Sequence, residues 1–415
     1  MIGREEKIDK RLSNSIVAFF VIQSLNAVVK TVGTFPMSFQ GIISLISGAG
    51  IMLFLLSGLL FAIRRSAAVM IMSLIFFIFA YSISIFLSMF IRNEPIDLLI
   101  HDSALWTFAF WIPIGVYTYS IKDYRILYKA FYEGSFIIGI LMCITFIWFI
   151  IVGVSSDATE YNMFFSYTLI LPLLIHINEY IERKKVWIGL LAILELFAIV
   201  MYGSRGAVLC LIAYLILKLF TAQMSLGKSL FYLITILCIV ILGYELYINQ
   251  EIFESIGLHS RLLSKIELGE ATSGRNYVWK AGLIMVSEKP ILGYGIGGEY
   301  YGMTRLCERF TGIYVDEVSS LSPHNGIIQL MLNFGVPIGL SISLWIILSI
   351  LKLKNYKDPI VIDLFIIMFS SYIVPSMTVG DGIFIKPGIA IFIYMALRAK
   401  HYYYEQNKYK DQNFG

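Results

Sequence analysis

The chain has 415 residues, of which 58% are hydrophobic, 15% are aromatic and only 14% are charged, and its net charge is +4. Soluble globular domains carry about 25% charged residues, so this composition excludes a soluble domain and indicates a polytopic membrane protein. A membrane-spanning helix needs roughly 20 predominantly apolar residues, and runs of about that length recur along most of the chain.

Apolar runs bounded by charged residues predict an all-α fold of about twelve transmembrane helices. The first run carries Gln23 and Asn26 and no small-residue cleavage site follows it, so we expect it to be retained rather than removed as a signal peptide. The predicted spans are 12–29, 37–63, 66–91, 103–120, 131–153, 161–178, 186–202, 207–222, 229–248, 326–351, 359–377 and 381–398.

The distribution of Lys and Arg predicts the orientation, because cytoplasmic loops are enriched in these residues. One set of alternate loops and both termini hold 21 of them, whereas the other short loops hold 4. Both termini are therefore predicted to be cytoplasmic. The same alternation divides the chain into helices one to nine (1–248), an extracytoplasmic loop (249–323), helices ten to twelve (324–398) and a cytoplasmic tail (399–415).

Two carboxylates fall inside predicted spans, Glu195 in the seventh and Glu245 near the outer end of the ninth. An ionisable group in the membrane is costly enough to require a partner. Both residues are open to two interpretations, as members of structural pairs or as proton-relay groups of a transporter.

A tight outer turn is predicted between the seventh and eighth spans, where Gly203, Ser204, Arg205 and Gly206 are the only residues between the apolar runs. This places the guanidinium of Arg205 at the outer interface. A charge so close to hydrocarbon tends to be functional, although a snorkelling arginine that anchors a helix end would look the same.

Within the long loop, the stretch from Ser273 to Tyr301 predicts an amphipathic helix with Arg275 in its first turn, ended by Pro290 and glycines. Such a helix lies on the bilayer or packs against the bundle. The segment GYGIGG, 293–298, lacks the spacing and the preceding strand of a dinucleotide fingerprint. Its backbone amides suit an anion-binding nest, or it is a flexible turn.

At the mouth of the tenth span stand Pro323, His324 and Asn325, and Pro323 suits the start of a helix. A histidine there exchanges protons near neutral pH and is predicted to face the same side as the two arginines. The alternative is a helix cap or a surface residue. No metal site is expected, since the outer loops contain no Asp-x-Asp pair and Asp316 and Glu317 are adjacent.

Three segments resemble the bacterial O-antigen polymerase and O-antigen ligase superfamily of Wzy and WaaL type: GSRGA at 203–207, SGRNYVWKAGLIMVSEKPILGYGIG at 273–297 and SPHNGIIQLMLNFGVPIGL at 322–340. The resemblance covers the C-terminal half. It implies a GT-C-like membrane glycosyltransferase in the bacterial inner membrane, with an active site facing the exterior and without metal or cofactor.

The resemblance also implies the substrate and the roles of the residues. Undecaprenyl-pyrophosphate-linked oligosaccharides would serve as donor and acceptor among the membrane lipids. Arg205 and Arg275 would bind the pyrophosphate, His324 would accept the proton of the attacking sugar hydroxyl, and Asn325 would support it. A chain-length regulator protein is a further candidate partner, and no nucleic acid is expected.

Three functions are compatible with these motifs. We expect a polysaccharide polymerase of O-antigen or capsule type. The first alternative is a ligase that transfers the glycan to a lipid A core or a protein. The second is a transporter of the lipid-linked unit, which would depend on intramembrane charges such as Glu195.

Overall fold

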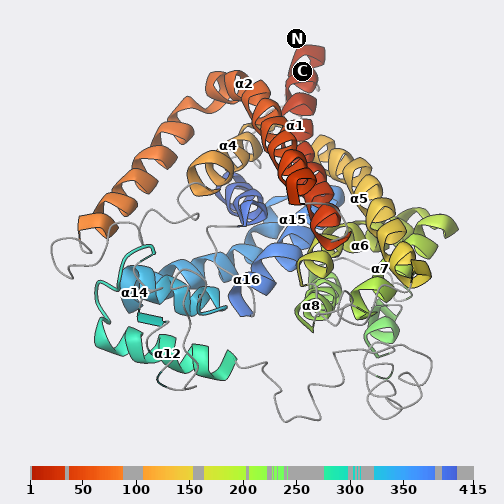
Figure 1. Ribbon diagram of the computed structural model, residues 1–415. Helices are drawn as coiled ribbons and strands as arrows, with labels where there is room; N and C mark the ends of the chain where they lie inside the picture. Colours follow the sequence, from red (N-terminus) through yellow and green to blue (C-terminus); the bar gives the residue numbers. More distant parts are fainter. Residues whose placement is uncertain are drawn as a thin grey trace. The chain divides into compact units, whose positions relative to one another are not determined.

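The computed structural model describes residues 2–32, 37–86, 106–152, 163–201, 205–221, 275–297, 322–378 and 386–399, with isolated positions between 227 and 241 and between 302 and 309. The regular structure of these residues is helical, and the described part of the chain contains no strand (Figure 1). Glu245, most of the span predicted at 229–248, the segment 249–274 and the predicted tail lie outside the described residues.

The helices agree closely with the apolar runs of the sequence. A further apolar helix runs over Pro387–Ala399. The named elements are α1 (Ile2–Val32), α2 (Met37–Phe86), η3 (Thr107–Trp111), α4 (Ile112–Ser120), α5 (Tyr124–Val152), α6 (Met163–Arg183), α7 (Val186–Met201), α8 (Arg205–Thr221), α12 (Arg275–Glu288), α14 (Gly326–Leu348), η5 (Ser349–Asn355), α15 (Pro359–Met368), η6 (Phe369–Ile373) and α16 (Val374–Thr378).

The second, third and tenth predicted spans differ in detail from the structure. The second and third predicted spans belong to one long helix, α2, whose helical geometry is interrupted at Ser66 (φ −144°, ψ 38°), directly after the charged pair Arg64 and Arg65. The tenth span is interrupted at Gly335. Among the described residues, four helices are long and apolar enough to cross a membrane and three apolar helices are shorter, so the all-α membrane character is confirmed and the number twelve stays a prediction.

The chain forms two compact units. The first combines Met1–Gly58, Ile121–Ala271 and Asp358–Ser371, and it holds α1, α5 to α8 and α15. The second combines Leu59–Ser120, Thr272–Lys357 and Tyr372–Gly415, and it holds the later part of α2 together with α4, α12, α14 and α16.

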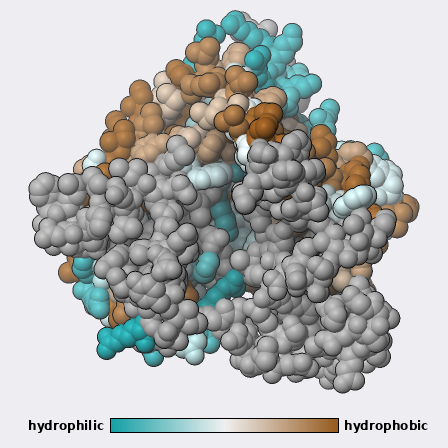
Figure 2. Space-filling view, viewed as in Figure 1, coloured by the Kyte–Doolittle hydropathy of each residue, from teal (hydrophilic) through white to brown (hydrophobic). Residues whose placement is uncertain are grey.

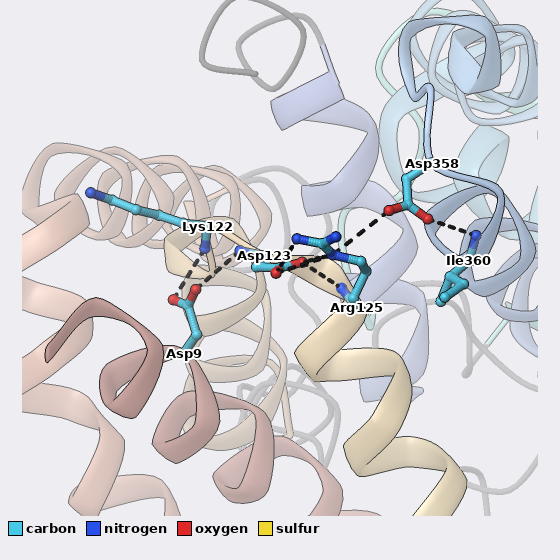
Figure 3. Close-up of polar contacts among 6 residues, drawn as sticks. All are labelled: Asp9, Lys122, Asp123, Arg125, Asp358 and Ile360. Carbon is cyan, nitrogen blue, oxygen red and sulfur yellow. Dashed lines mark hydrogen bonds and ion pairs between the residues drawn. The ribbon is translucent and has the colours of Figure 1, made fainter. Parts of the chain in front are cut away.

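In the first unit, carboxylates hold the starts of α5 and α15 (Figure 3). Asp9, which is buried on α1, accepts hydrogen bonds from the backbone N–H groups of Lys122 (3.2 Å) and Asp123 (3.0 Å) just before α5. Asp358 caps α15 by accepting from the N–H of Ile360 at 2.9 Å. Arg125 pairs with Asp123 at 2.8 Å and approaches Asp358 at 3.7 Å. Free N–H groups at helix starts are thus satisfied by side chains.

In the second unit, Tyr394 of the 387–399 helix is a central packing residue. Its hydroxyl lies 2.5 Å from the hydroxyl of Ser73, and its ring lies directly against Gly115 of α4, where a side chain would overlap it. The later half of α2 gives this unit an apolar outer surface on one side. Figure 2 shows hydrophobic side chains over the later half of α2, where Met72 and Phe79 are 70% and 64% exposed, as expected of helices that face lipid.

Candidate functional site

Arg205 is the first residue of α8, in the first unit. The preceding helix, α7, ends at Met201, so the two helices are separated by three residues, as the tight turn in the sequence predicts. The sequence placed Arg205 within the turn itself, whereas the structure makes it the first residue of the helix that follows. Its role as a pyrophosphate ligand stays a prediction.

Arg275 is the first residue of α12, in the second unit, and its side chain is half-buried. The predicted amphipathic helix is therefore confirmed. Met285 is buried, and Val278 and Trp279 pack against the same cluster. The helical spacing of the apolar residues in the sequence, Val278, Trp279, Leu283 and Met285, predicts that Leu283 shares their face. Leu283 is instead 52% exposed, because the buried face is centred on Ala281, Gly282, Met285 and Val286.

The apolar face of α12 packs against α14. Together they bury one hydrophobic cluster, and Gly282 fits against Ile328, where even a Cβ atom would lie 2.8 Å from the Ile328 side chain. The helix therefore packs within the protein. The cluster consists of Ala281, Met285, Val286, Tyr294, Met303, Ile328, Met331 and Leu332. Two of the three sequence segments that carry the family resemblance thus form one packed substructure.

The helix α14 is broken at Gly335, which has φ +79° and ψ 165°. Pro337 lacks an N–H group, so the carbonyl of Asn333 cannot receive its usual helical hydrogen bond. The N–H of Val336 leaves the helix and donates to the carbonyl of Pro290 at 2.7 Å. A Cβ atom on Gly335 would lie 1.9 Å from the carbonyl oxygen of Ile291, so only glycine fits this crossing.

The segment after α12 fills the break. The N–H of Tyr294 donates to the carbonyl of Leu332 at 2.5 Å, and the N–H of Gly295 donates to the carbonyl of Asn333 at 3.1 Å. The N–H of Ile296 donates to the hydroxyl of Ser84 at 2.8 Å. These three consecutive amides are committed to protein acceptors. These amides of the GYGIGG segment therefore hold the broken helix and Ser84, and this role replaces the interpretations as an anion-binding nest or a flexible turn.

His324 and Asn325 have different roles at the start of α14. The helix begins at Gly326 rather than at Pro323, and Asn325 is its N-cap, accepting from the N–H groups of Ile327 (3.0 Å) and Ile328 (3.1 Å). His324 is half-buried and has φ +45°. Left-handed backbone is uncommon for a residue other than glycine and costs about 1–3 kcal/mol. Histidine is therefore not the cap, and it is held in a strained conformation.

Glu195 has the partner that its burial requires. Its carboxylate contacts Nδ1 of His176 at 2.9 Å and 3.0 Å, and both side chains are fully buried in the first unit. Gly139 of α5 leaves room for this pair, since a Cβ atom there would lie 2.1 Å from a Glu195 oxygen. The contact joins two adjacent helices, α6 and α7, and agrees with the interpretation of Glu195 as a member of a structural pair.

A second buried ion pair was not identified from the sequence. Lys218 is one of the 21 Lys and Arg residues that the sequence count assigns to the cytoplasmic side. In the structure it lies in α8 at 2% exposure and contacts Asp363 of α15 at 2.5 Å. Its ammonium also donates to the side-chain carbonyl of Asn178 at 2.9 Å, and Tyr214 donates to the same oxygen at 3.0 Å. The signal was present in the sequence, because Asp363, like Glu195, interrupts an apolar run.

Two of the predicted site residues fall in the same unit. Arg275 and His324 stand at the starts of two helices in the second unit that pack on each other. Arg205 belongs to the first unit, so its relation to the other two residues stays a prediction. Within the part of the chain that the structure describes, no cluster of three or more His, Cys, Asp or Glu residues could hold a metal ion.

The comparisons with known proteins point in the same direction as the sequence segments. Residues 190–379 match a protein family described as O-antigen ligase. No curated protein and no solved structure matches the chain. The matched region includes Arg205, Arg275, His324 and Asn325, and both helices of the packed substructure. The resemblance to the O-antigen polymerase and ligase superfamily is thereby confirmed over residues 190–379.

Proposed function

We propose that this membrane protein is a glycosyltransferase that polymerises undecaprenyl-pyrophosphate-linked oligosaccharide repeat units at the outer face of the cytoplasmic membrane. The observation that carries the proposal is the O-antigen ligase family match over residues 190–379, which contains all three motif segments. The described structure adds that two of these segments pack into one substructure with Arg275 and His324 at its helix starts.

The proposed chemistry is a displacement at the anomeric carbon of the donor. A hydroxyl oxygen of the acceptor sugar forms the new bond to that carbon while the bond to the pyrophosphate oxygen breaks. His324 accepts the hydroxyl proton, and the lipid pyrophosphate leaves as an anion. Arg205 and Arg275 stabilise the charge that develops on it, because a guanidinium offers planar, bidentate hydrogen bonding to phosphate. Asn325 supports His324 by fixing the start of α14.

The backbone at His324 supports its assignment as the base. A strained residue persists only where its surroundings hold it, and such residues cluster at functional sites. Here Asn325 fixes the first turn of α14 and the N–H of His324 reaches the hydroxyl of Ser322 at 3.4 Å. Strain at a helix mouth is consistent with a side chain that must meet a soluble sugar rather than pack.

The orientation belongs to the same proposal: twelve spans in a GT-C-like arrangement, both termini in the cytoplasm and 249–323 outside. Reporter fusions at Lys184 and Glu270 test it directly. Opposite sides are expected for the two fusions, because the charge bias places 183–185 inside. If both fusions report the same side, the topology is wrong.

A ligase is the second candidate, favoured by the description of the matching family. Incubation of purified protein with lipid-linked repeat units separates the candidates. A ladder of products on a gel is expected for a polymerase, and a single transfer to a lipid acceptor would identify a ligase. No covalent product would point to transport. In that case Glu195→Gln should abolish function while His324→Ala leaves polymer of normal length.

A further inference from the structure

A polar groove lies between the start of α1 and the middle of the first half of α2, within the first unit. It has a volume of about 350 Å³ and is lined by Lys7, Lys10, Arg11 and Asn14 from α1, together with Phe54 and Ser57 from α2. This volume corresponds to roughly a dozen water molecules at about 30 Å³ each. The groove is therefore larger than a phosphate group and has room for a phosphate with a small organic substituent.

The basic residues of the groove share one face of α1. Their spacing of three, four and seven residues from Lys7 places them side by side on a helix. Two acidic neighbours contact α5 and the residues before it: Asp9 accepts from the N–H groups of Lys122 and Asp123, and Glu5 pairs with Lys122 at 3.1 Å. Two of the three carboxylates at the start of α1 are thus directed toward α5. The groove face keeps a concentrated positive charge, which favours an anion.

The floor of the groove offers hydrogen-bond acceptors. The hydroxyl of Ser15 donates to the carbonyl of Arg11 at 2.9 Å, and the hydroxyl of Ser57 donates to the carbonyl of Phe54 at 2.7 Å. The two hydroxyl oxygens lie 3.3 Å apart. Because each proton is used on a backbone carbonyl, the oxygens remain as acceptors. Ser15 is only 1% exposed, so the half-buried Ser57 is the residue that offers its oxygen to the groove. A ligand that fits both features carries an anionic phosphate and, beside it, a hydroxyl donor.

The surroundings of the groove favour a lipid over a soluble compound. Phe54 forms part of the wall and is 46% exposed, and the adjacent Leu53 is 69% exposed. In Figure 2 the hydrophilic start of α1 lies at the top of the view. Exposed apolar side chains next to basic ones are the surroundings that a headgroup and its acyl chain meet at a bilayer surface.

We infer that the groove between α1 and α2 binds the phosphoglycerol headgroup of an anionic membrane lipid. Lys7, Lys10 and Arg11 hold the phosphate, the hydroxyl oxygen of Ser57 accepts from a glycerol hydroxyl, and an acyl chain lies along Leu53 and Phe54. With the predicted orientation, the lipid belongs to the cytoplasmic leaflet, away from the glycan-joining site. The inference does not depend on the proposed function.

Lipid binding to the purified full-length protein tests the inference. Native mass spectrometry in detergent would compare phosphatidylglycerol with phosphatidylcholine, which has no net charge, and with phosphatidic acid, which lacks the glycerol hydroxyls. We expect phosphatidylglycerol to bind at least tenfold more tightly than either. Equal retention of all three lipids would overturn the inference. Displacement of phosphatidylglycerol by millimolar inorganic phosphate would show that the groove takes a soluble anion instead.

Two sets of variants locate the binding. The triple variant Lys7→Gln, Lys10→Gln, Arg11→Gln should weaken phosphatidylglycerol binding about 100-fold, since each basic residue near an anionic surface contributes roughly a factor of five to ten. A matched variant removes three exposed charges elsewhere, Lys184→Gln, Lys185→Gln and Lys354→Gln, and should bind as the parent does. Equal losses in both would show a nonspecific charge effect.

A third variant tests the groove independently, in case the triple variant misfolds. Ser57→Leu keeps every charge but fills the floor of the groove between the helices. It should lower the preference for phosphatidylglycerol over phosphatidic acid to about onefold while the protein keeps its thermal midpoint with no added lipid. An unchanged preference would contradict the placement of the glycerol hydroxyls.

Discussion

In the first unit, two pairs of titratable side chains inside apolar helices are matched with each other, whereas in the second unit freed backbone groups are matched by the backbone of a neighbouring segment. His176 with Glu195 and Lys218 with Asp363 are examples of the first arrangement. The broken helix α14, closed by the N–H groups of Tyr294 and Gly295, is the example of the second. The first arrangement uses two pairs of charged groups internally. In the second unit, Arg275 is the first residue of α12 and His324 precedes the N-cap of α14, where we propose that substrate binds.

The largest effect is expected at Gly335, on which the second arrangement depends. Gly335→Ala combines a positive φ with a Cβ atom that would overlap the Ile291 carbonyl, so we expect a loss of about 2–6 kcal/mol of stability and of all product. Gly48→Ala is the control, because a Cβ there meets nothing within 4 Å. Thermal midpoints in detergent check this, and equal behaviour of the two variants would show that α14 is not closed as described.

The next effect, on stability, is expected when the buried pair of Lys218 and Asp363 in the first unit is broken. Asp363→Ala leaves the ammonium of Lys218 buried without its counterion, which costs about 3–5 kcal/mol. The double variant Asp363→Leu, Lys218→Met removes both charges and should recover most of that loss. Denaturation of the purified variants measures it. A double variant as unstable as Asp363→Ala would mean that the pair itself, rather than its balance of charge, holds α8 to α15.

The N-cap of α14 connects stability to the predicted site. Asn325→Ala should cost about 1 kcal/mol, because two N–H groups lose their acceptor, and should also lower turnover by displacing His324. Asn325→Asp keeps a capping oxygen and should restore both properties. Turnover and thermal midpoint measured on the same preparations decide the matter. Full activity of Asn325→Ala would remove Asn325 from the site.

The smallest effect is expected at the exposed pair shown in Figure 3. Arg125 and Asp123 form a close contact at 2.8 Å, but the Arg125 side chain is 59% exposed, so Arg125→Ala should cost about 0–1 kcal/mol. The same denaturation assay checks it. A loss as large as that of Asp363→Ala would show that the link from α5 to Asp358 matters more than exposure suggests.

Apolar runs predicted the helices well, because the lipid environment requires both apolar side chains and satisfied backbones. The helix that starts at Arg275 and the tight turn before α8 were also predicted, although Arg205 was assigned to that turn and the structure makes it the first residue of α8. Local patterns did not reveal the closure of α14 by 290–296 or the partners of Glu195 and Lys218. These contacts join residues far apart in sequence, so no periodicity within one segment encodes them.

The three candidate site residues illustrate the same division. Sequence placed Arg205 in a tight turn, Arg275 in the first turn of a helix and His324 at the mouth of a helix. In the structure Arg205 and Arg275 are the first residues of α8 and α12, and His324 precedes the N-cap of α14. The sequence could not predict that Asn325 is the N-cap and His324 its strained neighbour, because both residue types occur at helix starts. Nor could the sequence predict that the N–H groups of the glycine-rich segment close the break in α14. A segment whose backbone N–H groups are free has the same sequence pattern as one whose N–H groups are hydrogen-bonded.

The most direct test of the account measures donor binding and turnover together for variants of the three residues. Arg205→Lys and Arg275→Lys should weaken binding of the lipid-linked donor as well as the rate, because an ammonium lacks the planar fork of guanidinium. His324→Ala should leave donor binding largely intact and lower turnover by roughly 10²- to 10⁴-fold. If His324→Ala keeps nearly full turnover, or loses donor binding as severely as the arginine variants, His324 is not the base and the account is contradicted.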